Sequence, residues 1–202
     1  NNIAEPSTSG TDYYVDENAT GNGNGLSEAN AFTTFLEGVQ NVQAGGTLWV
    51  KVGTYTRNDS HTPSYEGTTT NPIKIIGYKT TIGDLDGFNY YPRNGTSPSL
   101  DDTEMPLILG QEVANKGGIR IDNDNGYIIK NLQFEGWHRG IIAFGTSSYV
   151  YVDNCIFKDN NGNTGANSTG EGIRLGDDNG SQHDSYFRVT SSTSINNALA
   201  NL

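Results

Sequence analysis

Hydrophobic and polar residues alternate through residues 117–195, and the alternation starts anew three times. The openings read Gly118-Ile119-Arg120-Ile121, then Gly140-Ile141-Ile142-Ala143, then Gly172-Ile173-Arg174-Leu175. A period of two residues is typical of a β-strand, in which successive side chains point to opposite faces. We therefore predict a strand at each opening, with the first and third apolar residues inward and Arg120 and Arg174 outward.

The first two copies also match where they end, and all three copies contain turns of similar composition. The pair Asn131 and Phe134 in the first copy corresponds to Asn154 and Phe157 in the second. Between the strands lie Asn-Asp-Asn-Gly, Gly-Thr-Ser-Ser and Asp-Asp-Asn-Gly, which are turn-forming residues that tolerate a left-handed backbone. Repeats too short to bury their own apolar face form a core by stacking on one another. The sequence predicts an all-β fold, a right-handed single-stranded parallel β-helix over residues 13–202, with Asn131 and Asn154 stacked as an amide ladder.

The pattern before the repeats is different, because it includes one helical stripe. We predict a polar tail over residues 1–12, a strand over 13–15 and an amphipathic helix over about 30–43. Ser27 or Asn30 is expected to cap the helix start, and Gly45-Gly46 to end it. Such a helix would cover the open end of the first coil. The apolar stripe consists of Phe32, Phe35, Leu36, Val39 and Val42.

Two long insertions interrupt the strands, at about residues 79–106 and 160–170. Loops of this length are usually functional or disordered. The first contains Tyr90 and Tyr91, whose rings are suited to stack on sugars or to pack against the wall of the solenoid. Both readings stay open from the sequence.

Residues 13–55 carry a resemblance to a known family. They contain a strand that ends in Val15-Asp16, a Gly-rich loop, the helical run Ala31-Phe32-Thr33-Thr34-Phe35, and a strand that closes with Gly53-Thr54-Tyr55. This order is similar to the N-terminal signature of the pectate-lyase-like parallel β-helix superfamily. The resemblance implies the β-helix fold and leaves the function open, since the superfamily includes polysaccharide lyases and hydrolases, phage tail proteins and non-catalytic surface proteins.

Composition and charge limit the classes of molecule that the protein is expected to bind. The chain has 202 residues, of which 33% are hydrophobic and 26 are Gly, and its formal net charge is −11. An acidic surface excludes binding to the phosphate backbone of nucleic acids and disfavours an anionic membrane. We expect a secreted, extracellular or virion-surface protein. Cys155 is the single cysteine, so no intramolecular disulfide forms, and its apolar neighbours predict a buried structural thiol.

The resemblance also implies a catalytic mechanism. Lyases of the superfamily remove a proton beside a uronate carboxylate with a Lys or Arg base, while Ca²⁺ or another cation neutralises the acid. Arg120 and Arg174 are the candidate bases, because the repeats place them in one outward column with Ile142 between them. Lys130 is a third candidate catalytic residue. The alternative for Lys130 is a solvated surface charge.

Acidic residues follow the two arginine strands. Asp122, Asp124, Asp177 and Asp178 offer the hard oxygen ligands that Ca²⁺ prefers. Their alternative role is to form turns, since the segment from Asp122 to Gly126 lacks the distal Glu of a complete calcium loop.

Candidate substrate-binding residues are Trp137 and His138, at the corner between the first two copies, with Tyr90 and Tyr91. A corner in which Trp137 packs inward is the alternative.

Two functions therefore stay open. The first is a carbohydrate-directed protein, most simply a Ca²⁺-assisted lyase that cleaves uronate polysaccharides by β-elimination. The second is a non-catalytic structural or glycan-binding module of a phage tail, virion or cell-surface fibre. Residues 194–202 show no capping pattern, and open strand edges invite pairing. We therefore expect further domains of a longer chain, or closure by other subunits as in a homotrimer.

Overall fold

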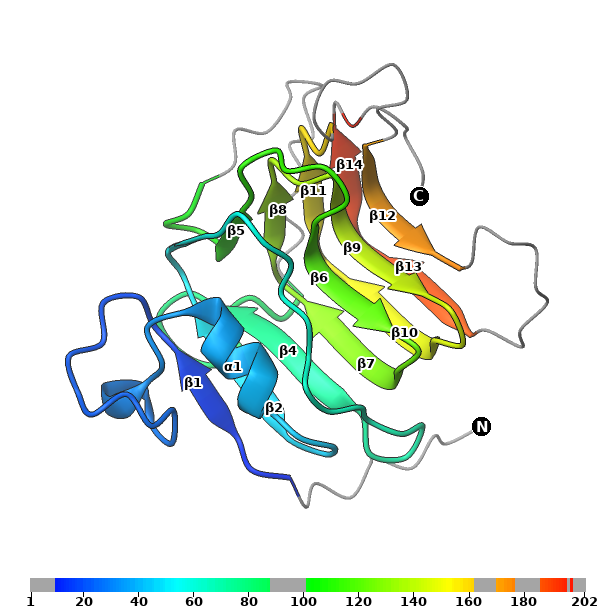
Figure 1. Ribbon diagram of the computed structural model, residues 1–202. Helices are drawn as coiled ribbons and strands as arrows, with labels where there is room; N and C mark the ends of the chain where they lie inside the picture. Colours follow the sequence, from blue (N-terminus) through cyan, green and yellow to red (C-terminus); the bar gives the residue numbers. More distant parts are fainter. Residues whose placement is uncertain (1–9, 88–100, 162–169, 177–185, 196, 198–202) are drawn as a thin grey trace.

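The computed structural model of the chain describes residues 10–87, 101–161, 170–176, 186–195 and 197. The described fold is all-β, with three sheets in which every pair of neighbouring strands is parallel (Figure 1). Sheet A has the order β1 (Tyr13–Val15), β2 (Thr47–Lys51), β4 (Ile73–Tyr78), β7 (Asn125–Lys130), β10 (Ser148–Asp153) and β13 (Phe187–Thr190). Sheet B has the order β14 (Thr193–Ile195), β11 (Ile156–Lys158), β8 (Gln133–Glu135), β5 (Leu107–Leu109) and β3 (Thr54–Thr56). Sheet C has the order β12 (Glu171–Leu175), β9 (Arg139–Phe144) and β6 (Gly117–Asp122).

From β6 onward the chain visits sheets C, A and B in that order, and it does so three times. We call one such passage a circuit. Ile119 pairs with Ile141, which pairs with Ile173, so like residues of successive circuits lie side by side. This confirms the strands predicted for the three copies and their parallel stacking. Ile119 is fully buried and Arg120 half-buried, as the alternation predicts.

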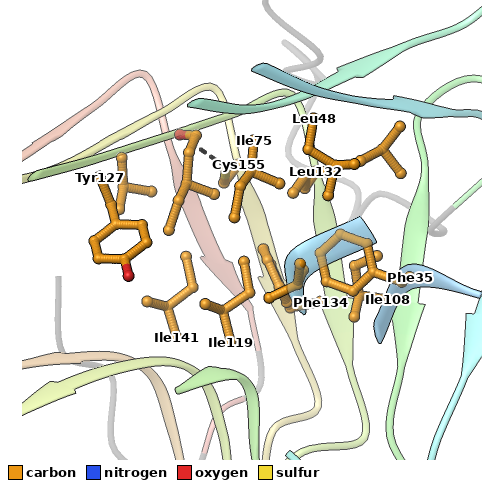
Figure 2. Packing of buried hydrophobic residues seen from close by; sticks show 14 of the residues in the cluster. Phe35, Leu48, Ile75, Ile108, Ile119, Tyr127, Leu132, Phe134, Ile141 and Cys155 are labelled. Atoms are coloured by element: carbon orange, nitrogen blue, oxygen red, sulfur yellow. Dashed lines mark hydrogen bonds between the residues drawn. The ribbon is translucent and has the colours of Figure 1, made fainter. Parts of the chain in front are cut away.

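The core lies between the three sheets and consists of columns of apolar side chains (Figure 2). One column contains Ile108, Phe134 and Phe157, and the two phenylalanine rings stack with centroids 5.4 Å apart. Cys155 is fully buried in the same core, which confirms the predicted structural thiol. Its burial raises the pKa of the thiol to about 12, so the thiol stays protonated and unreactive at neutral pH.

Amide side chains stack at the corner between sheets A and B. Asn131 and Asn154 both adopt a left-handed backbone, with φ of 59° and 49°. Asn154 Nδ2 donates to Asn131 Oδ1 at 2.9 Å, and Asn131 Nδ2 donates to the Gly77 carbonyl at 3.3 Å. This confirms the predicted amide ladder. A second amide column, not predicted, follows sheet B, where Asn160 and Asn197 donate to carbonyls of the preceding circuit.

The predicted N-terminal helix exists but is shorter than residues 30–43. Helix α1 (Phe35–Asn41) begins after Thr34, whose hydroxyl oxygen accepts from the Glu37 amide. The prediction that Ser27 or Asn30 caps this helix is therefore wrong. Ser27 instead caps the short 3₁₀ helix η1 (Glu28–Asn30), and Phe32 forms a parallel bridge with Val15. The Thr34 hydroxyl also donates to Glu37 Oε2 at 2.7 Å, and these two hydrogen bonds explain the later start. Helix α1 lies against β1 and β2.

A segment between β3 and β4 lies along β6 and covers the edge of sheet C. Arg120 N donates to the His61 carbonyl at 3.0 Å, and His61 Nδ1 donates to the Gly118 carbonyl at 2.8 Å. The His61 ring lies between the rings of Phe35 and Trp137. Burial is the main cause that lowers the His61 pKa to about 4, so the ring is neutral at pH 7. The segment thereby supplies the hydrogen bonds that an open strand edge would lack.

Candidate anion-binding groove

The outer face of sheet C brings the two predicted arginines into one column. In the register of the sheet, Arg120 of β6 lies opposite Ile142 of β9, and Ile142 lies opposite Arg174 of β12. The sequence-based placement of both arginines is therefore confirmed. The structure does not test their catalytic role, which stays a prediction.

A shallow groove of about 190 Å³ opens on this face. It contains a third guanidinium group, that of Arg139, which the sequence analysis did not single out. Two apolar side chains, Ile142 and Phe144, also line it. The lining residues are Asn115, Arg120, Arg139, Ile142, Phe144, Arg174 and Gly176.

The guanidinium group of Arg120 lies over an aromatic ring of the groove and beside a carboxylate. Its guanidinium carbon lies 4.8 Å from the centroid of the Phe144 ring, and Nη2 lies 3.5 Å from Asp122 Oδ2. A cation is attracted to the face of an aromatic ring, so both contacts favour this position of the side chain. The side chain is 36% exposed and thus accessible to solvent in part.

A buried carboxylate joins the other two arginines. Glu171 Oε2 accepts from Arg139 Nε at 2.8 Å, and Glu171 Oε1 lies 3.6 Å from Arg174 Nη1. The Glu171 side chain is 7% exposed, whereas that of Arg174 is 23% exposed. The groove thus holds three guanidinium groups against the carboxylates of Glu171 and Asp122, a local excess of positive charge on an acidic chain.

His138 lies behind the groove and is almost fully buried, at 7% exposure. Its Nδ1 accepts from the Asn115 amide at 3.0 Å and from Arg139 Nη1 at 3.3 Å. An acceptor on Nδ1 places the proton of the neutral ring on Nε2. Burial, followed by the charge of Arg139, lowers the pKa of His138. The ring thus contacts two residues that line the groove, and its predicted role in substrate binding stays a prediction.

The position of Trp137 contradicts the prediction that its ring binds substrate. The side chain is only 1% exposed, and its indole N–H donates to the Ile108 carbonyl at 2.8 Å. The ring therefore packs in the core and offers no face to a sugar, as the alternative interpretation had it.

Lys130 lies on a different sheet from the two arginines. It is the last residue of β7 in sheet A, and its Nζ lies 3.6 Å from carboxylate oxygens of Asp86 and Asp153. The three predicted catalytic residues are therefore not brought together in one site.

Two of the four predicted metal ligands can be placed. Asp122 lies at the margin of the groove, where it contacts Arg120 and accepts from Asn123 Nδ2. Asp124 follows in the turn, and its pKa is raised by burial and then by the charges of Glu66 and Asp122. Within the described ranges, no group of three or more His, Cys, Asp or Glu side chains is arranged to hold a metal ion. Asp177, Asp178, Tyr90 and Tyr91 lie outside the described residues, so the calcium site and the tyrosine contacts stay predictions.

One sequence signal could have identified the Arg139–Glu171 pair. Each copy opens on a repeated glycine, and the residues before these glycines are Gly117, Arg139 and Glu171. Parallel stacking in register places Glu171 beside Arg139. Asn115, in contrast, lies outside the repeats and carries no such signal.

The sequence was compared with protein-family models and with curated proteins, and neither comparison gives a match. In the part of the chain that the structure describes, no helix has the length and apolar character needed to cross a membrane.

Proposed function

We propose that the protein is a right-handed parallel β-helix that binds an acidic polysaccharide in the groove on sheet C. The single observation that carries this proposal is the convergence of Arg120, Arg139 and Arg174 on one groove of a chain whose net charge is −11. A concave surface lined mainly by charges of one sign concentrates ligands of the opposite sign.

The chemistry of the groove fits an anionic sugar. A guanidinium group presents its N–H donors in a planar fork that matches the two oxygens of a carboxylate or sulfate group. Ile142 and Phe144 offer apolar surface to the C–H face of a sugar ring. Neighbouring strands are about 4.8 Å apart, so Arg120 and Arg174 lie about 10 Å apart along the stack. Two cations repeated along a solenoid suit anions repeated along a polymer.

The contacts support binding more directly than cleavage. In a β-elimination, a base would take the proton beside the uronate carboxylate, the bond to the glycosidic oxygen would break, and an unsaturated uronate would form. Arg120, Arg139 and Arg174 all form ion pairs, and the free electron pair of His138 is engaged by Asn115 and Arg139. We therefore propose binding as the function and treat lyase activity as the outcome of a separate measurement.

The test is calorimetric titration with polygalacturonate, with neutral dextran as the comparison. We expect Arg120→Ala to weaken the binding of polygalacturonate about tenfold or more, because one charge-assisted contact is lost. Lys74→Ala is the matched control, since Lys74 is a basic residue of β4 on a different sheet. Equal affinity of the wild type and Arg120→Ala, or equal binding of dextran, would overturn the proposal.

The same samples answer the question of catalysis. We would follow the ultraviolet absorbance of an unsaturated uronate with Ca²⁺ and with a chelator. A signal in the wild type that Arg120→Ala lacks would add lyase activity to the binding function. Folded protein that neither binds nor cleaves the polymer would contradict the proposal and favour the structural module.

A further inference from the structure

We propose that His138 is an acid-sensitive positioning residue, which holds the anion-binding groove in shape when neutral and releases it when protonated. The inference rests on the proposed function, because it assigns a regulation to the same groove.

One nitrogen atom of the His138 ring accepts two hydrogen bonds. His138 Nδ1 accepts from the backbone amide of Asn115 at 3.0 Å and from Arg139 Nη1 at 3.3 Å. Asn115 and Arg139 are both lining residues of the groove. Asn115 has φ of 61°, a left-handed conformation that its surroundings must hold in place. His138 thus positions one backbone turn and one guanidinium group on the groove wall.

The charged groups around the ring favour its neutral form. Arg139 on β9 and Arg174 on β12 face it as cations, and Glu171 on β12 faces it as the one carboxylate among them. Lys116, next to Asn115, forms an ion pair with Asp59 at 2.7 Å. Burial, then Arg139, lower the pKa of His138, and Glu171 opposes this only in part. The neutral form of the ring is therefore favoured at pH 7.

Protonation reverses the role of the nitrogen atom. A protonated Nδ1 carries a hydrogen atom, so it can no longer accept from Asn115 or Arg139 and instead faces two donors. The added positive charge also repels Arg139. We therefore expect acid to loosen the groove and to weaken anion binding. Simple electrostatics predicts the opposite, because an additional positive charge should strengthen the binding of an anion, so the sign of the pH effect separates the two.

The experiment uses dextran sulfate, because its sulfate groups do not titrate in the range studied. We expect wild-type affinity to fall about tenfold as the pH is lowered from 7 through the range where His138 protonates. His138→Asn is the informative variant, since its side-chain oxygen can accept where Nδ1 did and does not titrate. Its affinity should stay constant over the same range. His138→Ala, which lacks the acceptor, should bind weakly at every pH at which it is folded.

A second measurement on the wild type needs no ligand. We would follow the Asn115 amide by NMR of ¹⁵N-labelled protein as the pH is lowered. Its chemical shift should change with the protonation of His138, and its hydrogen exchange should become faster. His138→Asn should show neither effect. If dextran sulfate does not bind the wild type at pH 7 but the amide behaves as described, the proposed function fails and the positioning role stands. An affinity that rises in acid, an amide that does not respond, or identical pH profiles of the wild type and His138→Asn would overturn the inference.

Discussion

Two columns of like residues run through this molecule, and they differ in whether their members attract or repel one another. Asn131 and Asn154 repeat an amide at the corner between sheets A and B, whereas Arg120 and Arg174 repeat a guanidinium group on the outer face of sheet C. An amide is both donor and acceptor, so a stack of amides satisfies its own hydrogen bonds. A guanidinium group only donates, and a stack of them repels. Stability explains the first column but not the second.

The arrangement keeps the repulsion in the arginine column small. Ile142 separates the two arginines, and at a distance of about 10 Å two like charges repel by about 0.4 kcal/mol in water. Glu171 supplies a counter-charge between Arg139 and Arg174. The groove therefore keeps its positive charge at little cost to the fold, provided that Glu171 is present.

The largest effect is expected from removing that counter-charge. Glu171→Gln leaves Arg139 without an ionised partner in a nearly buried position, and breaking a buried pair in this way costs about 3–5 kcal/mol of unfolding free energy. Urea denaturation measures the loss. Glu135→Gln is the matched control, because Glu135 forms a more exposed pair with Lys158 at 3.6 Å and should cost below about 1 kcal/mol. Equal losses in the two variants would show that Glu171 has no special role.

A smaller effect is expected in the amide column. Asn131→Ala removes the acceptor for Asn154 Nδ2 and the donor to Gly77, and it leaves the left-handed backbone without the polar side chain that compensates for this conformation. The unpaired groups and the strain together should lower the unfolding free energy by about 2–3 kcal/mol. Asn131→Gly should recover about 1 kcal/mol of this loss, because glycine adopts positive φ freely. The same urea titration checks both values, and an alanine variant as stable as the wild type would mean that the ladder contributes nothing.

The smallest effect on stability is expected for Arg120→Ala, although this substitution is expected to weaken binding about tenfold or more. Arg120→Ala removes a half-exposed side chain whose ion pair with Asp122 spans 3.5 Å. Pairs of this kind contribute little, so the unfolding free energy should change by less than about 0.5 kcal/mol. A loss above about 2 kcal/mol would mean that the arginine column, like the amide column, serves the fold. The two columns would then no longer differ in their contribution to stability.

The sequence predicts the columns well because they depend on periodicity. Alternation within a copy identifies inward and outward residues, and repetition between copies identifies lateral neighbours, so the placement of Arg120 beside Ile142 and of Asn131 beside Asn154 could both be predicted. The start of helix α1 was misplaced because two hydrogen bonds between Thr34 and Glu37 outweigh the longer apolar stripe. Phe32 belongs to that stripe but pairs with β1.

The other residues of the site differ in how far the repeats predict them. Arg139 and Glu171 lie opposite each other in the register of the repeats, so their contact could have been predicted. Asn115 precedes the first copy, so the repeats do not predict its hydrogen bond to His138. Whether Trp137 faces solvent or the core is decided by the neighbouring carbonyl of Ile108, which no local pattern encodes.

The register of the circuits has an evolutionary consequence. Asn131 and Asn154, which occupy the same position in consecutive circuits, are 23 residues apart. A tandem duplication of a segment of this length would meet the same neighbours above and below, so the gene could lengthen without a new core. Each duplicated copy of the β6 strand would also bring one more outward guanidinium group. Under the proposed function, the number of copies would set the length of polymer that the protein contacts, and point mutations within the groove would adjust its preference.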